Sequence, residues 1–197
     1  QIARLTHAGA IVSLGHSACA SAEGQAAFAA GASCVTHLFN AMSGLGSREP
    51  GLVGASLTTQ AVKAGLIADG IHVHPDSIRI ACAAKADDTV FLVTDAMAPL
   101  GTKISEFTLN GRHVLRRNGR LTLDDGTLAG ADLTMAQAVR VMVEKVGVSL
   151  EQALRMATSV PAGVLRAQNG CGHLRTGARW RGVHLAEDFS ITDPLAR

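Results

Sequence analysis

Residues 61–72 read AVKAGLIADGIH, an apolar run from Ala61 to Ala68 that leads directly into Asp69 and His72. A short, continuous apolar run bounded by polar residues is typical of a strand buried on both faces of a parallel sheet. Three further runs have this form: residues 10–16, 32–38 and 89–94. Helical patterns alternate with the runs, which predicts strand–helix units and a parallel sheet in an α/β fold.

Helix and loop signals separate the four runs. Ser21 is a candidate N-cap for a helix that ends near Gly31, and Pro75 is a candidate first residue for a helix that reaches about Lys85. Residues 40–54 are rich in glycine and are predicted to form a long loop. The four strand–helix units amount to half of an eight-unit barrel, an architecture whose chemistry lies at the carboxyl ends of its strands.

The second part of the chain departs from this rhythm. Asn110-Gly111 and Asn118-Gly119 are favoured hairpin turns, and they predict a β-hairpin excursion over about residues 104–126. Thr134-x-x-Gln137 and Ser149-x-x-Gln152 predict the starts of two helices near the C-terminal end.

The composition narrows the class of protein. Hydrophobic residues make up 47% of the chain and charged residues 17%, which suits strands covered by helices. A formal charge of +2 and 3% aromatic residues do not indicate a surface that binds nucleic acid. No apolar run reaches the roughly 18 residues of a membrane helix. We therefore expect neither nucleic-acid nor membrane partners. Four widely spaced cysteines and no recognisable targeting segment predict reduced thiols in a cytoplasmic protein.

Histidines or aspartates stand at the end of all four runs: His16, His37, Asp69 with His72, and Asp95. Imidazole and carboxylate are the usual ligands of a catalytic zinc ion, and an aspartate beside the attacking water can act as general base and then acid. Taken singly, each histidine also fits a structural loop residue, and Asp95 also fits a cap. Together, on four successive strands, they predict a metal site at one rim of the sheet.

The motifs at these positions resemble those of the N-acetylglucosamine-6-phosphate deacetylases, in the amidohydrolase superfamily, over about residues 1–168. The segments that carry the resemblance occur in the family's order: Gly15-His16-Ser17, Thr36-His37-Leu38-Phe39-Asn40-Ala41-Met42, Arg48-Glu49-Pro50-Gly51, Ala68-Asp69-Gly70-Ile71-His72, Val93-Thr94-Asp95-Ala96, Gly126-Thr127-Leu128-Ala129-Gly130 and Leu133-Thr134-Met135. The resemblance implies the C-terminal half of a (β/α)8 TIM-like barrel. It also implies metal-dependent hydrolysis of the acetamide of N-acetylglucosamine 6-phosphate.

The same resemblance implies a role for each matching residue. His16 and His37 would bind a divalent metal ion, with zinc expected first and iron, manganese or cobalt as alternatives. Asp95 would be the catalytic acid and base. Contacts with the phosphorylated amino sugar would come from Asn40, Ala41, Arg48, His72, Leu128, Ala129 and Gly130.

Among these contacts, Asn40, Ala41 and Arg48 would hold the sugar phosphate. Arginine suits phosphate because its planar fork donates paired, charge-assisted hydrogen bonds. Arg48 would reach the site of a neighbouring subunit in a homodimer. On the residues alone, Arg48 also fits a solvated loop position, and Leu128-Ala129-Gly130 also fits an ordinary turn into a helix.

Two features depart from the family's pattern. The family takes a third metal ligand, a glutamate, from the N-terminal half of its barrel, whereas Glu23 is the only acidic residue before His37 here and lies in a predicted helix. We therefore expect an incomplete metal site in a chain that begins at Gln1 without an initiator methionine. Near the other end, Trp180-Arg181-Gly182 stands where the family has a small residue, an aspartate and an apolar residue.

The expected organisation is a partial barrel over residues 1–168 and a segment over 169–197 that returns to a small β-sandwich. Three hypotheses for function stay open at this point. The first is deacetylation of N-acetylglucosamine 6-phosphate by the parent enzyme. The second keeps the fold but changes the substrate to another N-acyl compound or a cyclic amide. The third is a non-catalytic binding or assembly module.

Overall fold

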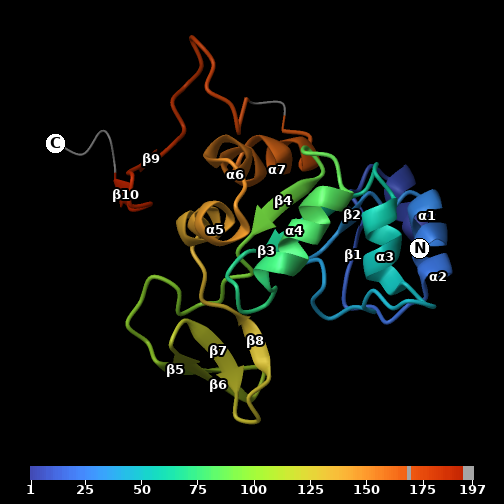
Figure 1. The fold of residues 1–197 in the computed structure, drawn as a ribbon, viewed down its shortest axis with the longest axis horizontal. Helices are drawn as coiled ribbons and strands as arrows, with labels where there is room; N and C mark the ends of the chain where they lie inside the picture. Colours follow the sequence, from blue (N-terminus) through green and yellow to red (C-terminus); the bar gives the residue numbers. More distant parts are fainter. Residues whose placement is uncertain (168–169, 193–197) are drawn as a thin grey trace.

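The computed structural model describes residues 1–167 and 170–192, and its centre is a four-stranded parallel sheet (Figure 1). The strands are paired in chain order: β1 (Ser13–Leu14), β2 (Cys34–Val35), β3 (Lys63–Ile67) and β4 (Val90–Val93). All three pairings are parallel. The four apolar runs thus form the predicted parallel sheet, although β1 and β2 are shorter than their runs.

The register of the sheet shows which residues of neighbouring strands lie side by side. Leu14 pairs with Val35, Val35 with Ala64, and Ala64 with Val90. β3 and β4 continue together as far as the pair of Ile67 and Val93. Because all four strands run in the same direction, their carboxyl ends open onto one rim.

Helices cover the sheet and complete the core (Figure 1). Their bounds are α1 (Ile2–His7), α2 (Ser21–Ala29), α3 (Gly51–Thr58), α4 (Pro75–Ala84), α5 (Met135–Val141), α6 (Leu150–Ala157) and α7 (Ser159–Val164). α4 buries Ile78 and α6 buries Met156 in one apolar cluster with the strand residues Leu66 and Leu92. The exposed fraction of these four side chains is 2% or less, so the sheet and its helices share one tightly packed interior.

The start of α2 differs from the expectation. Ala20, not Ser21, is the N-cap, and Ser21 is the first helical residue. The Ala20 N–H donates to the Glu23 carboxylate at 2.8 Å, and the Ser21 N–H donates to the Glu49 carboxylate at 2.7 Å. Two carboxylates therefore satisfy the N–H groups of the N-cap and of the first helical residue, which have no partner within the helix. In α4, by contrast, Pro75 opens the helix as predicted.

The predicted loop over residues 40–54 is wrong at its end, because α3 begins at Gly51. Glycine has a low helix propensity, so Gly51 and Gly54 make the sequence of α3 look like a loop. Tertiary packing overrides that preference, since every residue from 51 to 57 is buried. The buried Lys85 ammonium donates to the carbonyls of Ser56 and Thr59 at 3.0 Å, which satisfies the end of α3, and burial lowers the pKa of Lys85.

The excursion after β4 is larger than a hairpin. It is a four-stranded antiparallel sheet of β5 (Glu106–Leu109), β6 (Arg112–Arg117), β7 (Arg120–Leu123) and β8 (Leu128–Ala131), which forms the lower lobe of Figure 1. The two predicted turns are confirmed: φ is 50° and 74° at Asn110-Gly111, and 51° and 72° at Asn118-Gly119. These left-handed pairs match the twist of a β-hairpin. Leu128-Ala129-Gly130 lies in β8 rather than in a turn.

The C-terminal helices begin where their caps predict. Thr134 and Gln137 form the expected capping box at α5, and the Ser149 side chain accepts from the Gln152 N–H at α6. α5 runs directly into a π-helical turn, Met142–Val146, which ends at Gly147 with a left-handed φ of 86°. No helix in the described residues is long and apolar enough to cross a membrane.

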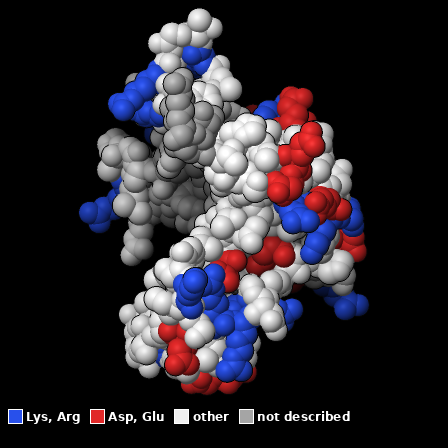
Figure 2. Space-filling model, turned by 90° about the vertical axis from the view of Figure 1, so that its left-hand side faces the viewer, with Lys and Arg blue, Asp and Glu red and all other residues white. Residues whose placement is uncertain are grey.

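Beyond α7, β9 (His184–Leu185) and β10 (Ile191–Thr192) form a small antiparallel pair. The expected return of residues 169–197 to a β-sandwich stays a prediction. The described part of the chain leaves out residues 168–169 and 193–197, at the two ends of that segment. Figure 2 shows basic and acidic side chains interspersed over the lower and right-hand parts of the face that it presents, whereas its upper left carries basic side chains alone.

Candidate functional site

The register of the sheet brings His16 and His37 to the same height. Each follows by two residues the last paired residue of its strand, Leu14 in β1 and Val35 in β2, and these two residues are partners. The imidazole Nε2 atoms of the two histidines lie 2.9 Å apart, and their ring centroids lie 4.8 Å apart with the rings inclined at 74°. Two nitrogen atoms from neighbouring strands thus meet at the rim.

This pair fits part of a metal site. Two nitrogens bound to a tetrahedral zinc ion at about 2.0–2.1 Å are about 3.3 Å apart, close to the separation found here. His37 is buried, and its Nδ1 has no hydrogen-bond partner within the described residues, so Nε2 is its only engaged nitrogen. No group of three His, Cys, Asp or Glu side chains in that part of the chain could hold a metal. The described residues therefore offer two imidazole nitrogens that could bind a metal.

Asp95 shares a cavity with His37. The cavity has a volume of about 290 Å³ and is lined by residues of all four parallel strands and of the segments that follow β2 and β4. Its lining consists of Ser13, Val35, Thr36, His37, Gly65, Phe91, Val93 and Asp95. The exposed Asp95 and the buried His37 therefore border the same cavity.

The three residues have a rare backbone conformation in common. φ is +48° at His16, +32° at His37 and +51° at Asp95, all left-handed although none is glycine. Such a conformation costs on the order of 1–3 kcal/mol per residue and persists only where the surrounding structure imposes it. Strain of this kind concentrates at functional sites, and the sequence carried no sign of it.

The segment after β2 holds the residues expected to bind phosphate. The Asn40 side chain donates to the carbonyls of His37 and Leu38 at 3.4 and 3.3 Å, so it supports the histidine turn. Ala41 has a left-handed φ of 48°, and Arg48 is exposed and forms no ion pair with a described residue. The structure thus places Arg48 in solvent and brings it to none of the other candidate residues.

Glu49, next to Arg48, has a role that the sequence did not reveal. One of its carboxylate oxygens accepts from the N–H groups of Ser21 at 2.7 Å and Gly51 at 2.9 Å. These backbone hydrogen bonds lower the pKa of Glu49. The carboxylate therefore ties the loop that carries Arg48 to the first turns of α2 and α3.

His72 is held by Asp69 just beyond β3. The His72 Nδ1 lies 2.6 Å from the Asp69 Oδ2, and 8% of each side chain is exposed. Burial raises the pKa of Asp69, but hydrogen bonds from His72 and from the Ile71 and His72 N–H groups outweigh it and hold the pKa below its usual value. The sequence marks Asp69 as a strand-end acid, but its hold on His72 appears only in the fold.

β8 brings Leu128-Ala129-Gly130 beside Asp95. The Ala131 N–H donates to the Asp95 carbonyl at 2.9 Å, and the Met97 N–H donates to the Ala131 carbonyl at 3.2 Å. Gly130 has a φ of +104°, and a Cβ at this position would lie 2.6 Å from the Met97 Sδ. A side chain at this position would therefore have to displace the Met97 side chain.

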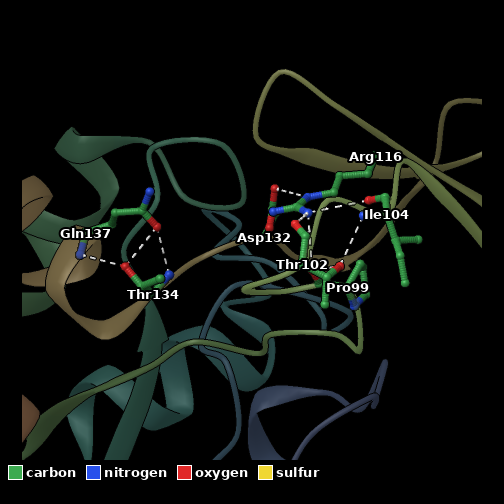
Figure 3. Close-up of polar contacts among 7 residues, drawn as sticks. All are labelled: Pro99, Thr102, Ile104, Arg116, Asp132, Thr134 and Gln137. Carbon is green, nitrogen blue, oxygen red and sulfur yellow. Dashed lines mark hydrogen bonds and ion pairs between the residues drawn. The ribbon is translucent and has the colours of Figure 1, made fainter.

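The ion pair of Arg116 and Asp132 holds the segment after β8 against the segment after Asp95 (Figure 3). The Arg116 Nε donates to the Asp132 Oδ2 at 2.7 Å, and the Arg116 Nη1 donates to the carbonyls of Pro99 at 3.1 Å and Thr102 at 2.6 Å. Asp132 directly follows β8, whereas residues 99–102 follow Asp95. Arg116 therefore clamps the segment that leaves Asp95 to the segment that leaves β8.

Comparisons with known proteins agree with this architecture. The model of the amidohydrolase family matches residues 2–193. An N-acetylgalactosamine-6-phosphate deacetylase from Shewanella sp. (strain ANA-3) is 43% identical over 97% of this chain and 48% of its own length. An N-acetylglucosamine-6-phosphate deacetylase from Lysinibacillus sphaericus is 39% identical over 84% of this chain and 43% of its own length.

A solved structure gives the same result. The N-acetylglucosamine-6-phosphate deacetylase from Pasteurella multocida superposes with a TM-score of 0.92 at 37% identity, over 96% of this chain and 50% of that one. The chain spans about half the length of the curated relatives it matches. Its parallel sheet and covering helices are part of a TIM-like barrel. The matched family model and these relatives show that the chain belongs to the amidohydrolase family.

Proposed function

We propose that this chain forms the C-terminal half of a metal-dependent (β/α)8 barrel enzyme. The enzyme would hydrolyse the acetamide of N-acetylglucosamine 6-phosphate to glucosamine 6-phosphate and acetate. The observation that carries the proposal is the meeting of the His16 and His37 nitrogens at 2.9 Å, beside a cavity that His37 shares with Asp95. The names of the relatives support the reaction, and the four successive parallel strands support half of an eight-stranded barrel.

His16 and His37 would hold the divalent cation, zinc first and iron, manganese or cobalt otherwise. A cation bound there supplies a water molecule of lowered pKa and polarises the amide carbonyl. The Asp95 carboxylate takes a proton from the attacking water and then delivers it to the departing amine nitrogen. The remaining carboxylate ligand would come from residues outside this chain.

The phosphate would be bound by the loop that follows β2. Arg48 is the cation of that loop, and its exposure leaves the guanidinium available to an anion or to the site of a neighbouring subunit. Asn40 and Ala41 would position the loop for this contact, and Leu128-Ala129-Gly130 would contact the sugar beside Asp95. A homodimer and a cytoplasmic location belong to the same proposal.

The Asp95 assignment is tested in the protein expressed from its complete coding sequence. Asp95→Asn is expected to lower kcat for acetate release by about 10²- to 10⁴-fold while bound metal stays unchanged. Asp88→Asn is the matched control, because Asp88 lies just before β4, whereas Asp95 lies just after it, and the Asp88 side chain is 80% exposed. Full activity in Asp95→Asn would refute the role.

The galacto epimer of the substrate is a second candidate. The Shewanella relative and one from Escherichia coli O157:H7, 43% and 41% identical, are named N-acetylgalactosamine-6-phosphate deacetylases. The two sugars differ only in the orientation of the hydroxyl at C4, so neither the metal ligands nor Asp95 distinguish them. The ratio of kcat/KM for the two phosphorylated sugars decides between the candidates.

Two broader hypotheses have their own tests. If Arg48→Ala leaves KM for the phosphorylated sugar unchanged, the phosphate assignment fails and another N-acyl or cyclic amide substrate is favoured. If the complete protein neither binds metal nor releases acetate, the chain belongs to a non-catalytic assembly module.

A further inference from the structure

Asp69 and His72 form a buried titratable pair outside the two proposed metal ligands. The Asp69 carboxylate is fully engaged: Oδ1 accepts from the N–H groups of Ile71 and His72, both at 2.8 Å, and Oδ2 faces the His72 Nδ1 at 2.6 Å. Each side chain is only 8% exposed. The loop that carries the pair follows β3, between the strands that precede His37 and Asp95.

The contact at 2.6 Å assigns a proton. An ionised carboxylate can only accept hydrogen bonds, so the hydrogen between Asp69 and His72 belongs to Nδ1 of the imidazole. In the neutral ring the other nitrogen, Nε2, then carries a lone pair and no hydrogen. No described residue forms a hydrogen bond with the His72 Nε2, so that lone pair has no partner among the described residues.

We propose that Asp69 is a positioning residue that locks His72 in its Nδ1-protonated tautomer. The bare Nε2 then accepts a hydrogen bond from a hydroxyl or amide N–H of the bound amino sugar. This contact with the sugar rests on the proposed function, because the substrate is taken from there. The assignment of the His72 tautomer does not rest on the proposed function.

The two oxygens of Asp69 have separable tasks. Oδ1 shapes the turn by accepting two backbone N–H groups, whereas Oδ2 selects the tautomer of His72. In Asp69→Asn the amide oxygen can keep both turn hydrogen bonds. The amide nitrogen would then face Nδ1 as a donor, which forces the imidazole proton onto Nε2. The substitution therefore reverses the tautomer while it keeps the turn.

The tautomer is read by NMR on the protein labelled with ¹⁵N-histidine, at a pH about two units above the ordinary imidazole pKa of about 6.5. Long-range ¹H–¹⁵N correlations distinguish a protonated from a bare ring nitrogen, and His72→Gln assigns the signals. We expect a protonated Nδ1 and a bare Nε2 at His72 in the wild type. A bare Nδ1 in the wild type would overturn the proposal without reference to any variant.

Asp69→Asn is expected to show the reverse pattern at His72, with backbone amide shifts of the strands unchanged. Asp76→Asn is the matched control, because Asp76 faces the His74 Nδ1 at 3.4 Å in an exposed pair four residues beyond the turn. That variant should leave the signals of His72 as they are. An Nδ1-protonated His72 in a folded Asp69→Asn protein would contradict control by Asp69.

The substrate contact is tested separately, in the complete enzyme. Asp69→Asn is expected to raise KM for the phosphorylated amino sugar by about tenfold, as expected when one polar contact to a ligand is mispaired, whereas Asp76→Asn leaves KM unchanged. An unaltered KM with a reversed tautomer would refute the contact with the sugar. Because NMR needs no substrate, the tautomer can hold even if the deacetylase proposal fails.

Discussion

At position 130 an added side chain would collide with Met97. The glycine has a φ of +104°, and an added Cβ would lie 2.6 Å from the Met97 Sδ. Gly130→Ala is therefore expected to lower the free energy of unfolding by about 2–3 kcal/mol, from backbone strain together with displacement of Met97. Urea denaturation of the variant measures the loss.

Gly126→Ala is the control for this substitution. Gly126 also has a left-handed φ, +86°, but nothing lies within 4 Å of an added Cβ. We expect a loss of about 1 kcal/mol there, from strain alone. Equal losses in the two variants would show that Met97 moves aside at no cost.

His113 makes the stability of the antiparallel lobe depend on pH. A hydrogen bond to Asp124 at 2.9 Å, helped by Glu106 at 3.5 Å, raises the pKa of His113. Because the folded pKa lies above the unfolded one, the stabilisation is full below the unfolded value of about 6.5 and is lost as pH rises through the folded value. The melting temperature of the wild type should therefore exceed that of His113→Gln by more at about pH 5.5 than at about pH 8.

The same melting curves recorded on an Asp124→Asn background isolate the cause. In the Asp124→Asn protein, the difference in melting temperature caused by His113→Gln should lose most of its pH dependence. The reason is that the strongest hydrogen-bond acceptor of His113 is gone. A gap of constant size across pH in the parent protein would mean that the exposed pair does not stabilise the fold.

At the level of elements, the Arg116–Asp132 ion pair joins the antiparallel lobe to the segment beyond Asp95. Arg116→Ala leaves the largely buried Asp132 carboxylate without its partner, so we expect a lower free energy of unfolding, measured by urea denaturation. Amide hydrogen exchange should accelerate in residues 99–104 and leave β3 and β4 protected.

Arg120→Ala serves as the control for the clamp, because Arg120 is an exposed residue of the neighbouring strand β7. Its replacement should change neither stability nor exchange by a measurable amount. Unchanged exchange around Pro99 in Arg116→Ala would show that the clamp does not restrain the segment beyond Asp95.

Elements were predictable where their cause is local. Pro75, the capping box of Thr134 and the Asn-Gly turns are short-range signals, and each is found where the sequence places it. α3 and β8 were missed because glycines conceal them, and burial or strand pairing overrides that local preference. Long-range contacts such as Arg116 with Asp132, 16 residues apart, leave no mark in the sequence.

For the molecule as a whole, the candidate site was predictable as a set of residues but not as a geometry. Apolar runs ending in His16, His37 and Asp95 indicated a shared rim. Their left-handed backbone and the 2.9 Å approach of two imidazoles depend on how separate strands pair, which no single stretch encodes. The exposure of Arg48 likewise depends on the folded loop.

Metal binding by the 197-residue chain tests the site at this scale. Two imidazoles are fewer than the three protein ligands of a usual catalytic zinc site, so we expect weak binding of zinc. His37→Ala should weaken it by about tenfold or more, whereas His72→Ala should not. Calorimetric titration with zinc chloride measures both, and tight stoichiometric binding by the chain would contradict a two-ligand site.

The pairing of Leu14 with Val35 has a consequence for how this architecture tolerates change. His16 and His37 each follow that pair by two residues. Main-chain hydrogen bonds between the strands, and not the lengths of the connecting loops, therefore set the distance between the two imidazoles. Insertions between strands should be harmless to the imidazole pair. A single residue inserted between Val35 and His37 would turn the ring toward the opposite face, so the strand ends form the part of the chain least open to indels.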